Sequence, residues 1–448
     1  MVTNETKYKN ESTSTISDLV GDYCPSLFYS HGTKKEGDLS LLSLFSGCGG
    51  MDIGFEGKFI CNKKSIPQEA DWVEEVVNDN WVLVKKNRFS TIFANDILPE
   101  AQATWTKYME RYDKDPSIYH LESIVDMVKA HRAGVKVFPD NVDIVTGGFP
   151  CQDFSVAGKR KGFDSEKGHD GKKHAEDIPS EETRGKLYYW MKQVIDITKP
   201  KMFVAENVKG LVTLGDVRDI IQSDFADADD GGYIVLHPQV LHAGNYGVPE
   251  TRERVIFIGI RRSALNQKAR EALESEVVPE EYNPYPKATH NFNVNDDKLP
   301  HAVTCRDVLG DLPEPDDSLD LSQRLYSKAK FMGKHCQGQT EIHYDGLAPT
   351  IRSEHHGNIE FRRLSEEHGG KLHEELANGL QERRLTPREC ALIQTFPPDY
   401  TFIRYKGYTK RFVVNQSGAY KVIGNAVPPV LAYNIARRIQ ELWSKYFE

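Results

Sequence analysis

The chain has 448 residues, 39% of them hydrophobic, and a formal net charge of −9. It contains no run of about 18 apolar residues, which excludes a membrane-spanning helix, and its polar start lacks the apolar core of a secretory signal. The seven cysteines form no CxxC pair, so neither a disulfide framework nor a zinc site is expected. The acidic balance disfavours a nucleic-acid partner but leaves room for a local basic face.

Strand-like and helix-like segments alternate over the first part of the chain. Short apolar runs indicate buried strands, and apolar side chains at the spacing of an amphipathic helix fill the segments between them. This alternation predicts an α/β fold with a mostly parallel sheet that helices cover on both faces. The predicted strands lie at 41–45, 90–96, 142–149, 201–208 and 254–261, and the predicted helices at 99–112, 185–197 and 217–225.

The alternation stops after residue 262. Proline, aspartate, histidine and glycine are frequent up to residue 380, and apolar runs are short, which predicts a second, irregular domain. Regular patterning resumes in the C-terminal segment. We therefore divide the chain into a tail (1–39), the first part of the α/β domain (40–262), the irregular domain (263–380) and the last part of the α/β domain (381–448).

A glycine-rich turn follows the first predicted strand in the sequence LFSGCGGMDIGF. Gly47, Gly49 and Gly50 let the backbone approach a ligand closely, although Asp52 breaks the dinucleotide fingerprint GxGxxG. Asp96 ends the second strand, where an acid can accept from ribose hydroxyls. The alternative is a purely structural turn beside an ordinary strand-end acid.

A single thiol follows the third strand in the sequence GGFPCQDFSVAGKRKG. The carboxyl ends of parallel strands meet at one edge of a sheet, so Cys151 is expected near the glycine turn, Asp96 and Glu206. A helix start and nearby bases lower a thiol pKa and make the thiolate a nucleophile. The alternative for an isolated cysteine is a small buried apolar residue.

Seven segments follow one another along the chain in this order: LFSGCGGMDIGF, GGFPCQDFSVAGKRKG, ETRGKLYYW, AENVKGL, NYGVPETRERVIFIGI, RRLTPRECALIQTFPPDY and GNAVPPV. Taken in that order, they resemble the DNA (cytosine-5) methyltransferases of bacterial restriction–modification systems. The likeness runs from about Leu41 to Val430. It implies a Rossmann-like, S-adenosylmethionine-dependent methyltransferase sheet, with residues 263–380 as a smaller target-recognition domain.

The resemblance implies a role for each catalytic candidate. Cys151 would attack carbon 6 of a cytosine flipped out of duplex DNA, which activates carbon 5 for methylation. Glu206 would contact ring nitrogen 3 and the exocyclic amine, Arg254 would hold the carbonyl oxygen of the base, and Arg252 would position the catalytic elements. Glu250 stands where the family usually has glutamine, which places an extra negative charge beside these arginines.

The resemblance also implies cofactor and DNA contacts. The residues expected to bind S-adenosylmethionine are Phe45, Ser46, Gly47, Cys48, Gly49, Gly50, Asp96, Ile97, Glu122, Pro150, Leu187, Asn425 and Val427. A basic loop after Cys151 and the irregular domain are expected to contact DNA, the domain by reading base edges. The expected DNA-binding residues are Ser155, Lys159, Arg160, Lys161, Thr350, Arg352, His355, His356 and Asn358, with Arg362 and Arg363 beside them.

Other functions compete with this interpretation. An enzyme that methylates transfer RNA uses the same motifs, and a catalytically silent DNA-binding relative could retain the fold. The sequence FPPDY superficially resembles the signature of amino-methylating enzymes, but its place in the motif order is wrong, and a zinc deaminase is disfavoured because Cys151 lacks a CxxC partner. We expect a monomeric, cytoplasmic, nucleoid-associated prokaryotic enzyme that binds no metal and shares its DNA site with a possible restriction endonuclease.

Overall fold

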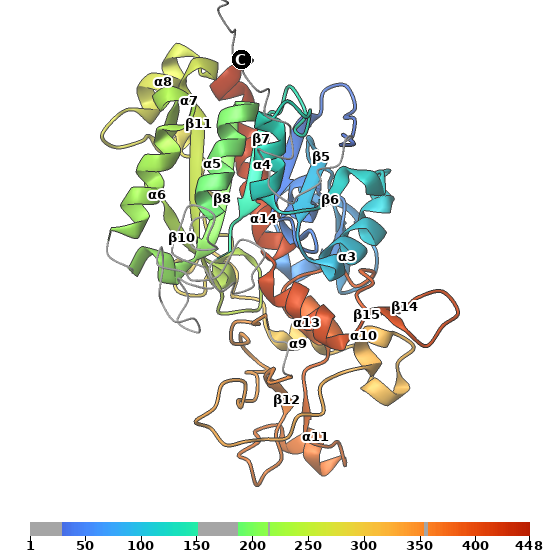
Figure 1. Ribbon diagram of the computed structural model, residues 1–448. Coiled ribbons are helices and arrows are strands. Elements are labelled where there is room, and N and C mark those ends of the chain that lie inside the picture. Colours follow the sequence, from blue (N-terminus) through green and yellow to red (C-terminus); the bar gives the residue numbers. More distant parts are fainter. Residues whose placement is uncertain (1–28, 151–186, 214–215, 354–356) are drawn as a thin grey trace, which may run out of the picture.

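The computed structural model describes residues 29–150, 187–213, 216–353 and 357–448. An eight-stranded sheet forms the centre of the protein, in the order β10-β11-β8-β7-β1-β5-β6, with β9 paired to β11 (Figure 1). The strands from β8 to β6 are parallel, and β11 runs antiparallel to β8. The strands are β1 Leu39–Leu44, β5 Phe89–Asp96, β6 Tyr119–Leu121, β7 Ile144–Gly148, β8 Met202–Val208, β9 Tyr233–Val235, β10 Gln239–His242 and β11 Glu253–Arg261.

Helices cover both faces of this sheet, as the α/β prediction required. Successive residues of β1 alternate between two apolar cores: Leu39 and Leu41 belong to one, Leu42 and Leu44 to the other. This alternation is the period-2 geometry of a strand buried on both faces. The first core contains α2 (Gly50–Glu56), α3 (Pro99–Met109) and α14 (Pro429–Phe447), and the second contains α4 (Ile124–Arg132), α5 (Leu187–Thr198) and α6 (Val217–Ala226).

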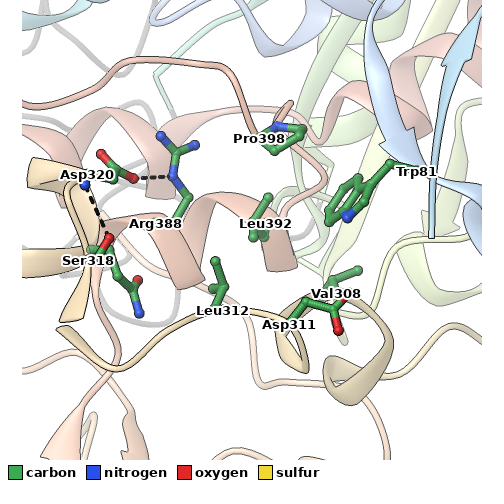
Figure 2. Close-up of a pocket in the computed structure, with 10 residues that line it drawn as sticks. Trp81, Val308, Asp311, Leu312, Ser318, Asp320, Arg388, Leu392 and Pro398 are labelled. Atoms are coloured by element: carbon green, nitrogen blue, oxygen red, sulfur yellow. Dashed lines mark hydrogen bonds and ion pairs between the residues drawn. The ribbon is translucent and has the colours of Figure 1, made fainter. Parts of the chain in front are cut away.

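A small antiparallel sheet formed within residues 60–84 contacts the segment around Asp307. Its strands are β2 (Ile60–Asn62), β3 (Val73–Val76) and β4 (Trp81–Val84), in the order β2-β4-β3. Lys64 pairs with Asp307 at 2.7 Å across this junction. A hollow of about 270 Å³ remains there, and Figure 2 shows Trp81 at one end and the Asp320–Arg388 ion pair at the other. The hollow is lined by Trp81 of β4, by residues 308–323 and by residues 388–398, so it belongs to the junction of these three segments.

The lower part of Figure 1 contains little regular structure. We call residues 305–384 the second lobe. It holds α9 (Cys305–Leu309), α10 (Leu321–Arg324), β12 (Phe361–Arg363), α11 (His373–Ala377) and β13 (Arg383–Arg384). The remaining elements are α7 Ala228–Gly231, α8 Gln267–Leu273, α12 Pro387–Ile393, β14 Arg404–Tyr405, β15 Phe412–Val414 and α13 Gln416–Asn425.

The chain returns to the central sheet at its C-terminal end. α14 packs against α2, and the thiol of Cys48 in the glycine turn lies 3.3 Å from the carbonyl oxygen of Val422 in α13. α8 lies against the end of α14, where the amide of Asn266 donates to the carbonyl of Tyr446. Within the ranges that the structure describes, no helix combines the length and apolarity that crossing a membrane requires.

Candidate functional site

The candidate site lies at the carboxyl edge of the parallel strands, where β1 is flanked by β5 and β7. The glycine turn follows β1, Asp96 ends β5, and Glu206 lies near the end of β8. Glu206 pairs in register with Gly148 of β7, and a Cβ atom on Gly148 would lie 2.7 Å from Glu206 Oε2. The absence of a side chain at Gly148 therefore leaves space for the carboxylate of Glu206. Cys151 itself lies outside the described residues.

The glycine turn is held by hydrogen bonds at its backbone. Gly47 adopts φ +55, its amide donates to Asp96 Oδ2 at 3.0 Å, and no other described segment comes within 4 Å of where its Cβ would be. The hydroxyls of Tyr119 and Tyr400 donate to the carbonyl oxygens of Gly47 and Cys48 at 3.0 and 2.7 Å. A turn with fixed carbonyls and open space beside Gly47 suits the close approach of a ligand.

Asp52 explains why the dinucleotide fingerprint fails. Its carboxylate accepts from Ser43 Oγ and from Trp105 Nε1, both at 2.6 Å, and the side chain is buried. Burial raises the pKa of Asp52 to about 6, while the hydrogen bonds from Ser43 and Trp105 act in the opposite direction. The acid anchors the tryptophan beside the turn. Sequence reasoning missed this role, although an acid in the first turn of a helix was the available signal.

The expected cofactor residues occupy different depths of the site. Asp96 lies at the strand end, where burial raises its pKa, although the amides of Leu98 and Gly47 stabilise the charged form. Ile97 is 41% exposed and offers an apolar surface next to Asp96. Tyr29 donates to Glu122 Oε2 at 2.7 Å. Phe45, Ser46 and Pro150 are half-buried, Cys48, Gly49, Gly50, Leu187 and Val427 are buried, and Asn425 is exposed at the end of α13.

These residues fit a nucleoside with a charged amino-acid portion. Asp96 presents a carboxylate for hydroxyl groups, Ile97 presents an exposed apolar surface for a ring, and the space beside Gly47 leaves the backbone accessible. S-adenosylmethionine contains each of these parts.

Glu206 forms a largely buried ion pair with Arg254 at the carboxyl edge of the sheet. Arg254 Nε lies 2.6 Å from Glu206 Oε1, and both side chains are about 10% exposed. Burial raises the pKa of Glu206, and the charges of Arg254 and Arg252 oppose that rise. A carboxyl group in this setting can hold a proton at higher pH than a solvated glutamate and can donate it to a buried base.

Arg252 and Glu250 connect three segments behind that pair. Arg252 is fully buried and donates to the carbonyl oxygens of Ile351, Gly424 and Ala426 at 3.0, 3.0 and 2.7 Å. Glu250 Oε1 accepts from the amide of Ile351 at 2.5 Å and lies 3.6 Å from Arg252 Nη1. These contacts tie the second lobe and the end of α13 to the strand that carries Arg254.

The structure changes the assignment of two predicted DNA contacts. Arg362 and Arg363 are buried, and each donates to Glu375, while Arg363 also pairs with Glu314. Their expected role at the DNA surface is therefore wrong, because a guanidinium enclosed by carboxylates holds the lobe together and cannot reach a phosphate. The sequence motif showed the arginines but not their partners.

The other predicted DNA contacts are only partly described. Arg352 is partly buried, with Glu360 at 3.0 Å and the side-chain oxygen of Gln337 at 2.7 Å. Thr350 donates to the carbonyl oxygen of Thr251, and Asn358 is half-buried. Among the described residues, no group of three or more His, Cys, Asp and Glu side chains could hold a metal ion. The candidates that lie outside the described residues are Ser155, Lys159, Arg160, Lys161, His355 and His356.

Comparisons with known proteins agree with the motif order. A family model described as C-5 cytosine-specific DNA methylase matches residues 39–441. Type II methyltransferase M.BsuRI of Bacillus subtilis is 31% identical over 427 residues, covering 92% of this chain and 81% of that protein. M.MthTI of Methanothermobacter thermautotrophicus is 27% identical, covering 90% and 98%. A crystal structure of a Spodoptera frugiperda DNMT2 mutant superposes with a TM-score of 0.50 at 16% identity, covering 91% and 100%, which shows a shared fold.

Proposed function

The chain belongs to the C-5 cytosine-specific DNA methylase family, and from this premise we propose that it methylates one flipped cytosine within a specific duplex sequence through a covalent bond to Cys151. It is a DNA (cytosine-5) methyltransferase, and its methyl donor is S-adenosylmethionine. The observation that carries the proposal is the buried Glu206–Arg254 pair. Cys151 follows Gly148, the register partner of Glu206, by three positions, so chain length limits the distance between the Cα atoms of Gly148 and Cys151 to about 11 Å.

Cytosine carbon 5 is a weak nucleophile until the ring is activated. The thiolate of Cys151 forms a bond to carbon 6, and the electron pair of the 5,6 double bond moves toward carbon 5 and the ring. Protonated Glu206 donates to ring nitrogen 3, where that electron density collects, and Arg254 holds both the carboxyl group and the carbonyl oxygen of the base. Carbon 5 would then take the electrophilic methyl group that the bound donor supplies. The proton on carbon 5 is lost to solvent, the electron pair of that C–H bond restores the 5,6 double bond, and the bond from carbon 6 to sulfur breaks to release the thiolate. Ring nitrogen 3 returns its proton to Glu206.

The cofactor would supply an electrophilic methyl group when bound between the glycine turn and Asp96. Ser46, Gly47, Cys48, Gly49 and Gly50 would hold its amino-acid portion, Asp96 its ribose, and Ile97 its adenine, with Glu122 near the adenine amine. The remaining expected contacts are Phe45, Pro150, Leu187, Asn425 and Val427.

Access to the base requires it to leave the duplex, at a cost of a few kcal/mol that phosphate contacts offset. We propose that Ser155, Lys159, Arg160 and Lys161 supply such contacts, and that residues 263–380 read sequence with Thr350, Arg352, His355, His356 and Asn358. The chain is similar to type II methyltransferases of Bacillus subtilis and Methanothermobacter thermautotrophicus. The proposed biological role is therefore protection of DNA from a restriction endonuclease with the same site, by a monomeric cytoplasmic enzyme.

A trapping experiment tests the mechanism. Duplex DNA with 5-fluorocytosine at the target should form a covalent adduct with the wild-type protein, because fluorine cannot leave carbon 5 as a proton does. Cys151→Ala should form no adduct and show no turnover while still binding the methyl donor. Cys336→Ala is the matched control, since that thiol is half-buried in the second lobe, and it should behave as the wild type.

Two results would reject the mechanism. Turnover by Cys151→Ala would exclude the thiol as nucleophile, and bound DNA and donor without an adduct would exclude the covalent step. Transfer RNA in a parallel reaction distinguishes the RNA-modifying alternative, and absence of methylation on either nucleic acid indicates a silent relative. Bisulfite sequencing of a host genome that expresses the protein would identify both product and recognition sequence.

A further inference from the structure

A β-hairpin projects from the side of the protein at the level where the central sheet and the second lobe meet (Figure 1). Its strands are β14 and β15, which are antiparallel, and residues 406–411 form the turn between them. The amide of Lys406 donates to the carbonyl oxygen of Arg411 at 2.8 Å, and Gly407 adopts φ +55 in the turn. The turn is therefore hydrogen-bonded across its base, and its side chains point into solvent.

The hairpin concentrates positive charge in a protein whose net charge is −9. Residues 404–414 include four basic side chains and no acidic one. Lys406, Lys410 and Arg411 are exposed, and within the described part of the chain no ion pair engages them. Charges without carboxylate partners are free to contact an external anion.

Exposed aromatic side chains accompany these charges. Tyr405 and Phe412 stack with ring centroids 4.6 Å apart and are 42% and 37% exposed, and Tyr408 at the tip is fully exposed. Large apolar side chains on a projecting turn gain nothing from the core, so a partner is the physical reason to place them there. Basic side chains interleaved with aromatic rings suit a polyanion that also presents sugars and bases.

The base of the hairpin is fixed to α3 and to α10. Arg404 donates to the carbonyl oxygen of Ala103 in α3, and Ile403 is buried with its amide 3.2 Å from Ser322 Oγ. One residue after β15, Asn415 caps α13, whose last turn lies beside the glycine turn. These contacts fix the position of the hairpin relative to the carboxyl edge of the central sheet.

We propose that the hairpin formed by residues 404–414 is a second contact for duplex DNA, beyond the base pairs that surround the flipped cytosine. This inference rests on the proposed function, which makes duplex DNA the substrate, and charge complementarity selects the phosphate backbone as the partner. α13 has a length of about 15 Å, and the hairpin adds roughly another 13 Å. These lengths place the tip at most about 28 Å from the glycine turn, so it would meet phosphates no more than about eight base pairs from the target at 3.4 Å per step.

The test compares binding of two duplexes that share one target site, with about 6 and about 20 base pairs on each side of it. Lys406→Ala/Lys410→Ala should bind the long duplex roughly tenfold more weakly than the wild type. The slope of log K against log salt should fall by about 2, because each lost phosphate contact removes about 0.9. Binding of the short duplex should stay within twofold of wild type.

Two controls keep the result specific. Lys35→Ala/Lys268→Ala removes the same charge from exposed side chains elsewhere and should leave the salt slope unchanged, whereas Lys406→Arg/Lys410→Arg keeps the charge and should restore the wild-type slope. An unchanged slope on the long duplex, or equal losses on both duplexes or in both alanine variants, would overturn the proposal. Methyl transfer by the wild-type protein to the short duplex tests the proposed function separately.

Discussion

The second lobe adds networks of buried arginine pairs to the apolar burial that stabilises the central sheet. In the sheet, residues such as Leu41, Leu42 and Phe93 are fully buried among apolar neighbours, and each contributes about 1.5–3 kcal/mol by leaving water. In the second lobe, Arg383 is held by Glu314 and Glu389, and Arg384 donates to the carbonyl oxygens of Ala329, Lys330, Gly338 and Ile359. In this lobe, guanidinium groups donate to backbone carbonyl oxygens that lie outside regular strands and helices, and they pair with carboxylates.

This difference shows how a lobe with few regular elements can keep one shape. Burial alone is non-directional, so it cannot select one path for an irregular chain, whereas a planar guanidinium fixes the positions of several acceptors at once. The stability that these ion pairs contribute depends on pH, however. Although burial raises the pKa of Glu314, its contacts with Arg383 and Arg363 lower that pKa to about 2. The stability from this pair is present above the normal pKa of 4.5 and is lost as pH falls toward 2.

Arg383→Ala should produce the largest loss of stability, and this loss should be confined to the second lobe. It leaves the carboxylates of Glu314 and Glu389 without this guanidinium, which costs about 3–5 kcal/mol when a buried pair loses one member. Hydrogen exchange should show lost amide protection in β12 and β13 and retained protection in β1 and β5. The control Arg306→Ala removes an exposed pair with Asp345, worth at most about 1 kcal/mol. Equal loss of protection in both regions would show that they unfold as one unit.

Asp52→Asn tests the comparison on the side of the sheet, where this buried acid accepts hydrogen bonds from Ser43 and Trp105 but, within the described residues, forms no ion pair with an arginine. Its folded pKa of about 6 exceeds the ordinary 3.8, so its favourable contribution is complete below pH 3.8 and is lost as pH rises through 6. The asparagine variant should lack this dependence and gain up to about 3 kcal/mol relative to wild type between pH 4 and pH 7. Urea unfolding at both pH values measures this difference.

The exposed Asp71 provides a control for that measurement. Asp71→Asn should leave the pH dependence of stability between 5 and 7 unchanged, because this carboxylate pairs with Lys85 in solvent. A wild-type protein whose stability stays constant between pH 4 and pH 7, like that of Asp52→Asn, would contradict the buried-acid account.

Glu250→Gln should produce the smallest effect, at the junction of the two regions. The amide oxygen can still accept from Ile351, so stability should change by less than about 1 kcal/mol. Burial raises the pKa of Glu250, opposed by Arg252, so wild-type stability should fall as pH rises above 4.5, and the glutamine variant should not share that fall. Glu250→Leu removes the acceptor and should cost about 1–3 kcal/mol. Indistinguishable unfolding of the Gln and Leu variants would exclude the hydrogen bond as the connection.

The sequence predicted the strands of the central sheet better than the side-chain contacts of either region, because strand patterns are local and side-chain partners are often distant in the chain. The strands at 41–45, 90–96, 201–208 and 254–261 were visible because periodicity is a local property of a chain. The role of Asp52 was not visible, since Trp105 lies 53 residues away. Arg362 and Arg363 were assigned to DNA for the same reason: a sequence shows a charge but not whether a carboxylate neutralises it.

The sequence by itself determined the α/β class, the family, and the residues expected at the carboxyl edge of the sheet, because ordered motifs and strand-end positions need no knowledge of packing. Only the tertiary structure decided which charges are free. Glu314 meets Arg383 across 69 residues of chain, whereas Lys406 and Lys410 project into solvent. Burial and long-range pairing decide whether a basic side chain stabilises a lobe or stays free in solvent, and both arise only when distant segments pack together.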